Sequence, residues 1–199
     1  PGSLRSGLVP QILLSEVTLK PAWFRSRGYR HLDAPVGERY AARVSRPGFA
    51  ASHSWSPLIS YVKREKRYKP LQKRTVFKDR DIMYASHRDA CVLAYYASLL
   101  ASKLDDRYED AGLGQSVIAY RSLGKSNYDF TGVALDFALA HSPCSVMCFD
   151  VTGFFDNLDH GLLKGRLADV VGTPKLSGDW FAVFRTVTKF RHLALDAIK

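Results

Sequence analysis

The stretch CSVMCFDVTGFFDNLDHGLLKGRL, residues 144–167, carries more information about the fold than any other part of this chain. It opens with an apolar run, 146–151, whose β-branched and aromatic residues predict a buried strand. Asp150 stands near the end of that strand, and Gly153 marks a turn that leads into a helix. A carboxylate at the junction of a buried strand and a turn is suited to hold a hard cation such as Mg²⁺.

The order of residues in this stretch resembles the first catalytic motif of reverse transcriptases, above all the bacterial enzymes related to group II introns. The resemblance implies that Asp150, with the carbonyl of Val151, binds the catalytic Mg²⁺ or Mn²⁺ ions. It also implies that Phe155 stacks under the sugar of the incoming nucleotide, and that Asp156 and His160 hold the turn. The alternative is a plain strand and helix, with Asp150 on the surface and the phenylalanines in the core. The matching positions are Phe149, Asp150, Phe154, Phe155, Asp156, Asp159, His160 and Leu163.

The net charge of +10 is unevenly distributed along the 199 residues. Residues 1–80 hold 17 Lys and Arg against 5 Asp and Glu, whereas residues 81–199 hold 12 against 14. The N-terminal part is therefore expected to bind a polyanion.

The composition indicates a cytoplasmic protein without a membrane contact. No apolar run reaches the roughly 18 residues of a membrane span, and the first residues lack a secretory pattern. Residues 1–10, rich in Gly, Pro and Ser, are expected to be a disordered terminus or a cloning remnant. The three cysteines, Cys91, Cys144 and Cys148, stand in apolar surroundings and are expected to be reduced core residues.

The segment 58–80 interleaves basic and aromatic residues, as do surfaces that contact phosphates while offering rings to bases. Pro70 divides it into a predicted helix end and a predicted strand, 75–77. A solvated basic face without a ligand is the alternative. The patch comprises Lys63, Arg64, Lys66, Arg67, Lys69, Lys73, Arg74, Lys78, Arg80 and, just beyond, Arg88, with Tyr61, Tyr68 and Phe77 among them.

A strand running into a helix follows this segment. The helix is predicted at about 87–104, with Ser86 as its N-cap and Asp89 at the capping-box position. This order resembles the fingers of reverse transcriptases, where a guanidinium fork suits bidentate binding of phosphate. The resemblance implies that the triphosphate of the incoming nucleotide is contacted by Arg80 together with Lys73, Arg74 or Lys78.

A further predicted strand, 116–120, is followed by a turn and by a helix that ends near His141. Val-Ile-Ala-Tyr-Arg followed by Gly-Lys-Ser-Asn resembles the second fingers motif of bacterial reverse transcriptases, closest to the branch that defends bacteria against phages. The resemblance implies that Arg121 and Lys125 contact template or nucleotide phosphate and that Asn127 fixes the turn.

Two helices, at about 158–171 and 177–190, are predicted after the central motif, separated by a Gly-Thr-Pro stop signal. On the second helix, solvated charge is favoured over a primer or template contact. This helix is expected to bury Trp180, Phe181, Phe184 and Val187 and to leave Arg185, Lys189 and Arg191 on a basic side.

Two-metal phosphoryl transfer needs more carboxylates than Asp150 alone. The pair Asp105-Asp106 does not match the aromatic-x-Asp-Asp motif of polymerases, because it precedes Asp150 and has no aromatic residue two positions earlier. No adjacent Asp pair follows Asp150. We therefore interpret the chain as an incomplete α+β right-hand polymerase. It would comprise an irregular extension at 1–57, fingers at 58–142 and a partial palm at 143–199.

The resemblance implies an RNA-directed DNA polymerase that adds deoxynucleotides to a 3′-hydroxyl, using an RNA template and a nucleic-acid primer, in bacterial antiviral defence. The rest of the palm and the thumb would be supplied in cis or in trans, and the isolated chain is expected not to polymerise. The alternative is a non-catalytic RNA-binding or assembly module with the same fold.

Overall fold

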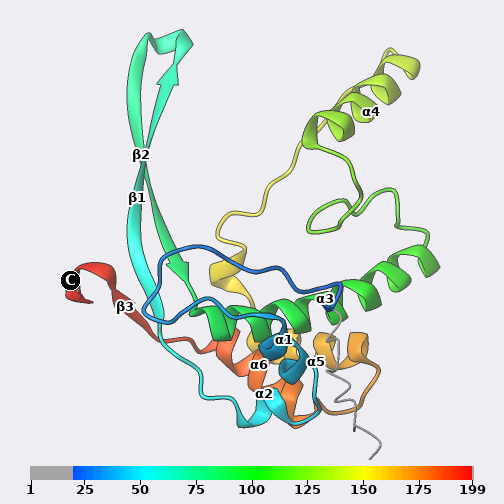
Figure 1. The fold of residues 1–199 in the computed structure, drawn as a ribbon. Helices are drawn as coiled ribbons and strands as arrows, with labels where there is room; N and C mark the ends of the chain where they lie inside the picture. The colour runs from blue at the N-terminus through cyan, green and yellow to red at the C-terminus, as the bar shows by residue number, and fades with distance from the viewer. Residues whose placement is uncertain (1–19, 199) are drawn as a thin grey trace, which may run out of the picture.

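The computed structural model describes residues 20–198 and has an α+β fold in three parts (Figure 1). A helical body carries a long β-hairpin on one side and a second arm, which ends in α4 (Asn127–Ala140), on the other. The described strands form one mixed sheet in the order β2-β1-β3. The predicted α+β class is thus confirmed, while residues 1–10 lie outside the described part.

The hairpin is formed by β1 (Leu58–Lys69) and β2 (Arg74–Tyr84), joined by the 3₁₀ turn η1 (Pro70–Gln72). The two strands pair antiparallel from Ile59 opposite Tyr84 to Lys69 opposite Arg74. The strand predicted at 75–77 is confirmed, but the helix predicted before Pro70 is wrong. Proline ends a strand as readily as a helix, and here the β2 ladder satisfies the backbone that a helix would otherwise satisfy internally.

A short third strand fastens the hairpin to the end of the chain. β3 (His192–Ala194) runs parallel to the first residues of β1, with Leu58 opposite His192. Just before it, the amide of Leu58 donates to the carbonyl of Arg191 at 2.8 Å. The base of the hairpin therefore lies beside the C-terminal end of the body.

The long helix α3 (His87–Asp110) runs through the body (Figure 1). Its predicted start is confirmed, because the Ser86 hydroxyl accepts the amide of Asp89 at 3.1 Å. The helix continues six residues past its predicted end, since the polar residues after 104 include no Gly or Pro before Gly112. In the expected capping box the Asp89 carboxylate would accept the backbone amide of Ser86. It accepts His53 and the amide of Ser56 instead.

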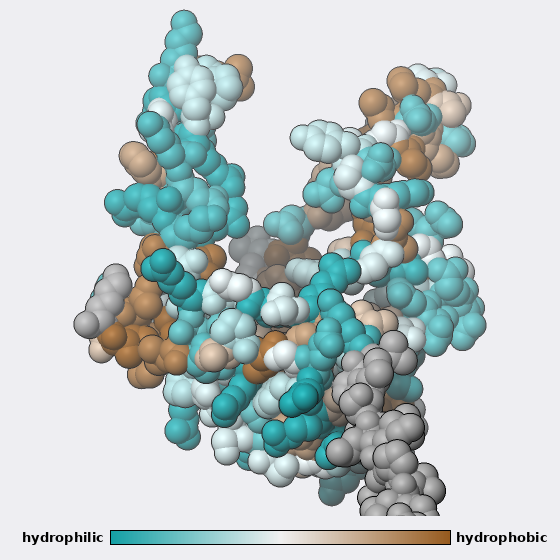
Figure 2. All heavy atoms as spheres, viewed as in Figure 1, coloured by the Kyte–Doolittle hydropathy of each residue, from teal (hydrophilic) through white to brown (hydrophobic). Residues whose placement is uncertain are grey.

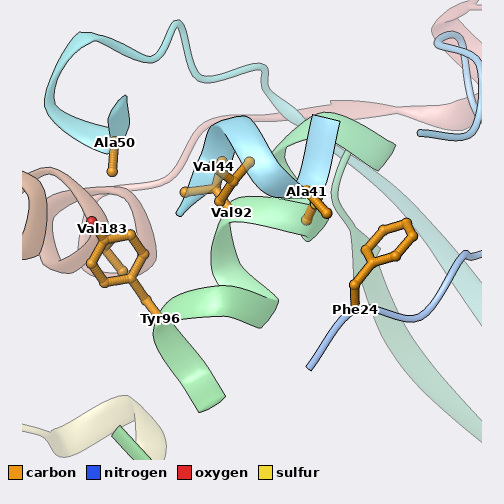
Figure 3. Packing of buried hydrophobic residues seen from close by; sticks show 8 residues of the cluster. Phe24, Ala41, Val44, Ala50, Val92, Tyr96 and Val183 are labelled. Carbon is orange, nitrogen blue, oxygen red and sulfur yellow. The ribbon is translucent and has the colours of Figure 1, made fainter. Parts of the chain in front are cut away.

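The main core lies where four helices meet: α1 (Glu38–Val44), α2 (Phe49–Ser52), α3 and α6 (Gly178–Thr188). Asp179, in the first turn of α6, accepts the amides of Gly48 and Ala51, both at 2.7 Å, which ties α6 to α2. Figure 3 shows the side chains that converge there, and the buried set comprises Phe24, Ala41, Val44, Ala50, Cys91, Val92, Tyr96 and Val183.

A smaller cluster packs α5 (His160–Val171) against α6. Both helices lie within two residues of their predicted bounds. The expected burial along α6 is only partly confirmed, because Phe184 is buried and Trp180 half-buried, whereas Phe181 and Val187 are exposed. The buried residues of this cluster are Ala168, Leu176 and Phe184.

The second arm, residues 111–157, contains no buried residue and is called the apolar arm. Within it α4 ends near His141, as predicted, and begins with a capping box between Ser126 and Asp129. The space-filling view shows hydrophobic residues gathered over α4 and hydrophilic ones over the hairpin (Figure 2). The exposed apolar side chains of α4 are Tyr128, Val133, Leu135, Phe137 and Leu139.

The strands predicted at 116–120 and 146–151 are wrong for this structure. The first segment forms turns, and the second has no regular secondary structure. A strand needs a neighbour for its backbone hydrogen bonds, and the sheet of the described residues pairs only β1, β2 and β3. Consequently Cys144 and Cys148 are exposed rather than core residues, and only Cys91 is buried. No helix among residues 20–198 has the length and apolar character to cross a membrane.

Candidate nucleic-acid interface

Strand alternation sorts the side chains of the hairpin onto two faces. Residues opposite each other across the ladder share a face, and the faces alternate along each strand. From the observed register, six cations and one carboxylate share one side, called the basic face. The other side is called the mixed face. The basic face carries Lys63, Glu65, Arg67, Lys69, Arg74, Lys78 and Arg80, and the mixed face carries Val62, Arg64, Lys66, Tyr68, Thr75, Phe77, Asp79 and Asp81.

Glu65 is the only acidic residue of the basic face, and it lies among three cations. Its carboxylate is 3.3 Å from Lys63 Nζ, 3.0 Å from Arg80 Nε and 3.5 Å from an Arg67 nitrogen. The hydrogen bond from Lys63 and the neighbouring guanidiniums lower the pKa of Glu65, which keeps it ionised at neutral pH. With six cations against one carboxylate, the face retains a strong positive charge.

The mixed face is nearly neutral and presents aromatic rings. Arg64 donates two hydrogen bonds to Asp79, both at 2.7 Å, and these raise the pKa of Arg64. Phe77 and Tyr68 are 64% and 63% exposed. Aromatic rings in such positions can stack on unpaired bases. The hairpin thus separates a strongly basic face from a nearly neutral face that carries exposed aromatic rings.

Lys73 stands apart from both faces, in the turn. It adopts a left-handed backbone with φ of 46°, and its amide donates to the carbonyl of Pro70 at 3.1 Å. Arg74 follows it, with its Nε donating to Gln72 at 2.9 Å. Of the residues expected to contact a triphosphate, Lys78, Arg80 and Arg74 therefore lie on the basic face, with Arg74 at the tip of the hairpin, whereas Lys73 lies in the turn.

A histidine-carboxylate clasp holds the base of the hairpin. Asp33 Oδ1 lies 2.7 Å from His31 Nδ1 and 2.9 Å from His87 Nδ1, and the carboxylate also accepts the amides of His87 and Arg88. Partial burial raises the pKa of Asp33, but the hydrogen bonds from His87 and Arg88 outweigh it and bring that pKa down to about 2. Tyr29 stacks on His87 and donates to the carbonyl of Ala85 at 2.8 Å.

The same clasp is the one group of three potential metal ligands found among residues 20–198. Its ligand atoms lie within 4.8 Å of one another. The 2.7 and 2.9 Å separations are hydrogen-bond distances, and Asp33 also caps the first turn of α3. We therefore assign the clasp a structural role. Neither sequence position nor spacing signalled it, because His31 and His87 are 56 residues apart.

Asp150 does not belong to any such group. It lies in an exposed segment without secondary structure, as does Val151, and Phe155 opens the 3₁₀ turn η2 (Phe155–Asn157) and is 72% exposed. Phe155 packs edge-on against Phe154, with ring centroids 5.3 Å apart. Because a single carboxylate and a carbonyl supply too few ligands, the described residues do not fit a pair of catalytic Mg²⁺ ions.

The turn after Asp150 is held by residues other than those expected. Gly153 has a φ of 63°, and its carbonyl accepts the side-chain amide of Asn157 at 2.8 Å. Asp159 caps α5 by accepting the amide of Leu162 at 2.7 Å. The glycine is required here because a left-handed backbone is strained for residues with a Cβ. The resemblance pointed instead to Asp156 and His160.

Arg121 faces the body rather than solvent. Its side chain is 7% exposed, and it donates to Asp105 at 2.6 Å and to Glu109 at 3.2 Å. It also donates to the carbonyl oxygens of Gly114 and Val117. These bonds fasten the start of the apolar arm to α3 and occupy the donors expected to bind phosphate.

Lys125 and Asn127 flank the cap of α4. Lys125 is exposed, with its Nζ 5.9 Å from the ring centroid of Phe130. Asn127 is the first residue of the helix, and Ser126 rather than Asn127 caps it. Lys125 thus belongs to the apolar arm, which stands apart from the hairpin (Figure 1).

A buried pair that the sequence did not reveal lies beside the hairpin base. Asp89 is 2% exposed, and its carboxylate accepts His53 Nε2 at 2.6 Å and the amide of Ser56 at 2.9 Å. The one signal in the sequence was the position of Asp89 in the first turn of a helix, which indicated a cap.

Comparison with protein-family models and with curated proteins finds no match to this chain.

Proposed function

We propose that this chain binds nucleic acid through the basic face of its hairpin and forms the fingers and partial palm of an RNA-directed DNA polymerase. The observation that carries the proposal is the sorting of six cations onto one face of a ribbon that extends from the body. The polymerase assignment is supported by the resemblance around 148–163 and 116–127, and catalysis would require carboxylates beyond those of the described residues.

The length and charge of the hairpin suit a polyanion. A strand of 12 residues spans roughly 40 Å at about 3.4 Å per residue. Cations spaced along that distance can neutralise several successive phosphates and release their counterions. The rings of the mixed face offer stacking surfaces for bases of an unpaired strand.

Two double variants of equal net charge test whether binding depends on the basic face. Arg67→Gln with Lys78→Gln removes two cations from the basic face, and Arg64→Gln with Lys66→Gln removes two from the mixed face. We expect the first pair to weaken binding of a 12-nucleotide oligouridylate about tenfold at 150 mM salt and to reduce the salt slope by about 1.5. The second pair should weaken it less than threefold.

Fluorescence anisotropy over a series of salt concentrations measures both quantities. Equal losses for the two double variants would show that net charge, and not the face, governs binding. Binding that does not respond to salt would contradict the phosphate contacts altogether.

A non-catalytic RNA-binding module is the second candidate. It is favoured by the surroundings of Asp150, which no group of further potential ligands joins among residues 20–198. Primer extension by the complete natural protein distinguishes the two functions. Incorporation of labelled deoxynucleotide that is lost on Asp150→Asn supports the polymerase, whereas RNA binding without incorporation supports the module.

A further inference from the structure

A pocket of about 560 Å³ opens at the base of the hairpin, outside both of its faces. Leu58, which begins β1, and Ala85, which follows β2, form part of its wall, and the C-terminal turn of α6 forms another part. Its size lies within the range of small-molecule sites. The pocket therefore lies where a strand of nucleic acid on the hairpin would meet the body.

Three cations line this pocket: Arg185, Lys189 and Arg191. No ion pair joins them to a carboxylate within the described part of the chain. The only acidic residue in the lining is Asp89, whose carboxylate already accepts His53 and the amide of Ser56. The pocket is thus positively charged and suited to a phosphate group.

Two aromatic residues, Trp55 and Phe190, share the lining with these cations. Trp55 packs edge-on against His53, with ring centroids 4.9 Å apart. Because Asp89 holds both His53 and Ser56, the wall that carries Trp55 is fixed to the first turn of α3. Aromatic rings beside cations are the combination that binds nucleotides by stacking and charge.

We propose that this pocket binds one nucleotide, with its phosphate on Arg185, Lys189 and Arg191 and its base against Trp55 and Phe190. The competing explanation for two of the cations is structural, because Arg185 and Lys189 lie at the C-terminal end of α6, where positive charge stabilises a helix. That explanation does not involve Arg191, which lies beyond the helix, or the rings.

Titration of the tryptophan indole signals by ¹H–¹⁵N NMR tests the proposal. The chain has three tryptophans, and Trp55→Phe identifies the signal of Trp55. The probes are ATP without metal, inorganic phosphate and 12-nucleotide oligouridylate, all at one ionic strength. We expect a saturable shift of the Trp55 signal with ATP or the oligonucleotide, and binding of inorganic phosphate at least tenfold weaker than that of ATP.

The variant Arg185→Gln/Lys189→Gln/Arg191→Gln should raise the Kd at least tenfold. Arg46→Gln/Lys103→Gln/Lys175→Gln removes the same charge from exposed positions outside the pocket and should change the Kd less than threefold. Urea unfolding checks that both variants fold, and Arg191→Gln alone, expected to raise the Kd about fourfold, replaces the triple variant if it does not fold. Unaltered Trp55 shifts in the pocket variants, or none in the wild type, would overturn the proposal.

The same titrations separate this proposal from the proposed function of the hairpin. The proposal rests on that function only where the bound nucleotide is one unit of a nucleic-acid strand. A shift with ATP alone assigns the pocket to a free nucleotide, and a shift with the oligonucleotide assigns it to one unit of a strand. Arg67→Gln/Lys78→Gln should weaken only oligonucleotide binding. Oligonucleotide binding that leaves Trp55 unmoved, with no effect of ATP, would retain the hairpin function and overturn the pocket.

Discussion

Two arms leave the body of this protein, and they differ in how their surfaces meet water. The hairpin, residues 58–84, pairs its two strands in an eleven-pair ladder and presents many charged side chains. The apolar arm, residues 111–157, has one helix and a long segment without secondary structure, and its exposed side chains include many large apolar ones. Charged side chains are well hydrated at the surface, whereas exposed apolar area is unfavourable in water.

The difference shows which arm is held in place by contacts within the described residues. The hairpin is anchored by β3, by the histidine-carboxylate clasp and by buried Ile59, so its form is determined within the described residues. The apolar arm is fastened by Arg121 at its start, and no described segment covers α4. The first arm is therefore suited to meet a charged ligand, and the second presents a surface typical of protein contacts.

The largest expected effect separates the anchored arm from the uncovered one. Ile59 is 3% exposed, and Ile59→Ala should lower the free energy of unfolding by about 3 kcal/mol through lost burial and a cavity. Leu135 is 58% exposed on α4, so Leu135→Ala should change it by less than about 0.5 kcal/mol. Urea denaturation measures both. A loss at Leu135 as large as that at Ile59 would mean that α4 is packed in solution.

Thiol reactivity tests the unpaired segment of the apolar arm. Burial raises the pKa of the Cys91 thiol to about 11, so little reactive thiolate forms at pH 8. We expect iodoacetamide to modify exposed Cys144 and Cys148 at least ~100 times faster than Cys91 in the native protein. Mass spectrometry of digests gives the rates, with urea-unfolded protein as the control. Protection of Cys148 would indicate that 146–151 is a paired strand after all.

The clasp at the hairpin base gives a pH-dependent effect. The folded pKa of Asp33, about 2, lies below its unfolded value, so its stabilisation is present above pH 4 and is lost as the pH falls from about 4 to 2. Asp33→Asn should therefore cost about 2 kcal/mol at pH 7, with the difference from wild type narrowing below pH 4. Asp136→Asn, at an exposed position of α4, is the control. A constant difference across this pH range would contradict the assignment.

The smallest expected effect is a gain in affinity. Glu65→Gln removes the carboxylate that binds Lys63, Arg67 and Arg80, so we expect two- to fivefold tighter binding of oligouridylate and a steeper salt dependence. Asp79→Asn removes one negative charge from the mixed face and should have a weaker effect. Anisotropy titrations compare the two, and equal gains would show that total charge decides.

Local signals predicted α3, α5 and α6, because capping and stop residues act within a few positions of the chain. The extension at 1–57 was expected to be irregular, and that prediction is wrong where it contains α1 and α2. Ser86 and Gly172 mark predicted boundaries that the structure keeps. The candidate site was predicted only as a list of cations, since the helix expected before Pro70 concealed the alternation of strand side chains. The prediction of burial failed most clearly at 146–151, because an apolar run forms a buried strand only if a neighbouring strand is present.

By itself the sequence determined the α+β class, the excess of positive charge before residue 81 and the capped start of α3, because composition and caps are local properties. The tertiary structure decided the rest. Pairing with β2 placed Lys78 and Arg67 on one face, folding turned Arg121 inward onto Asp105, and the meeting of α3 with α6 formed the basic pocket. These outcomes depend on contacts between residues far apart in the chain, which no local pattern records.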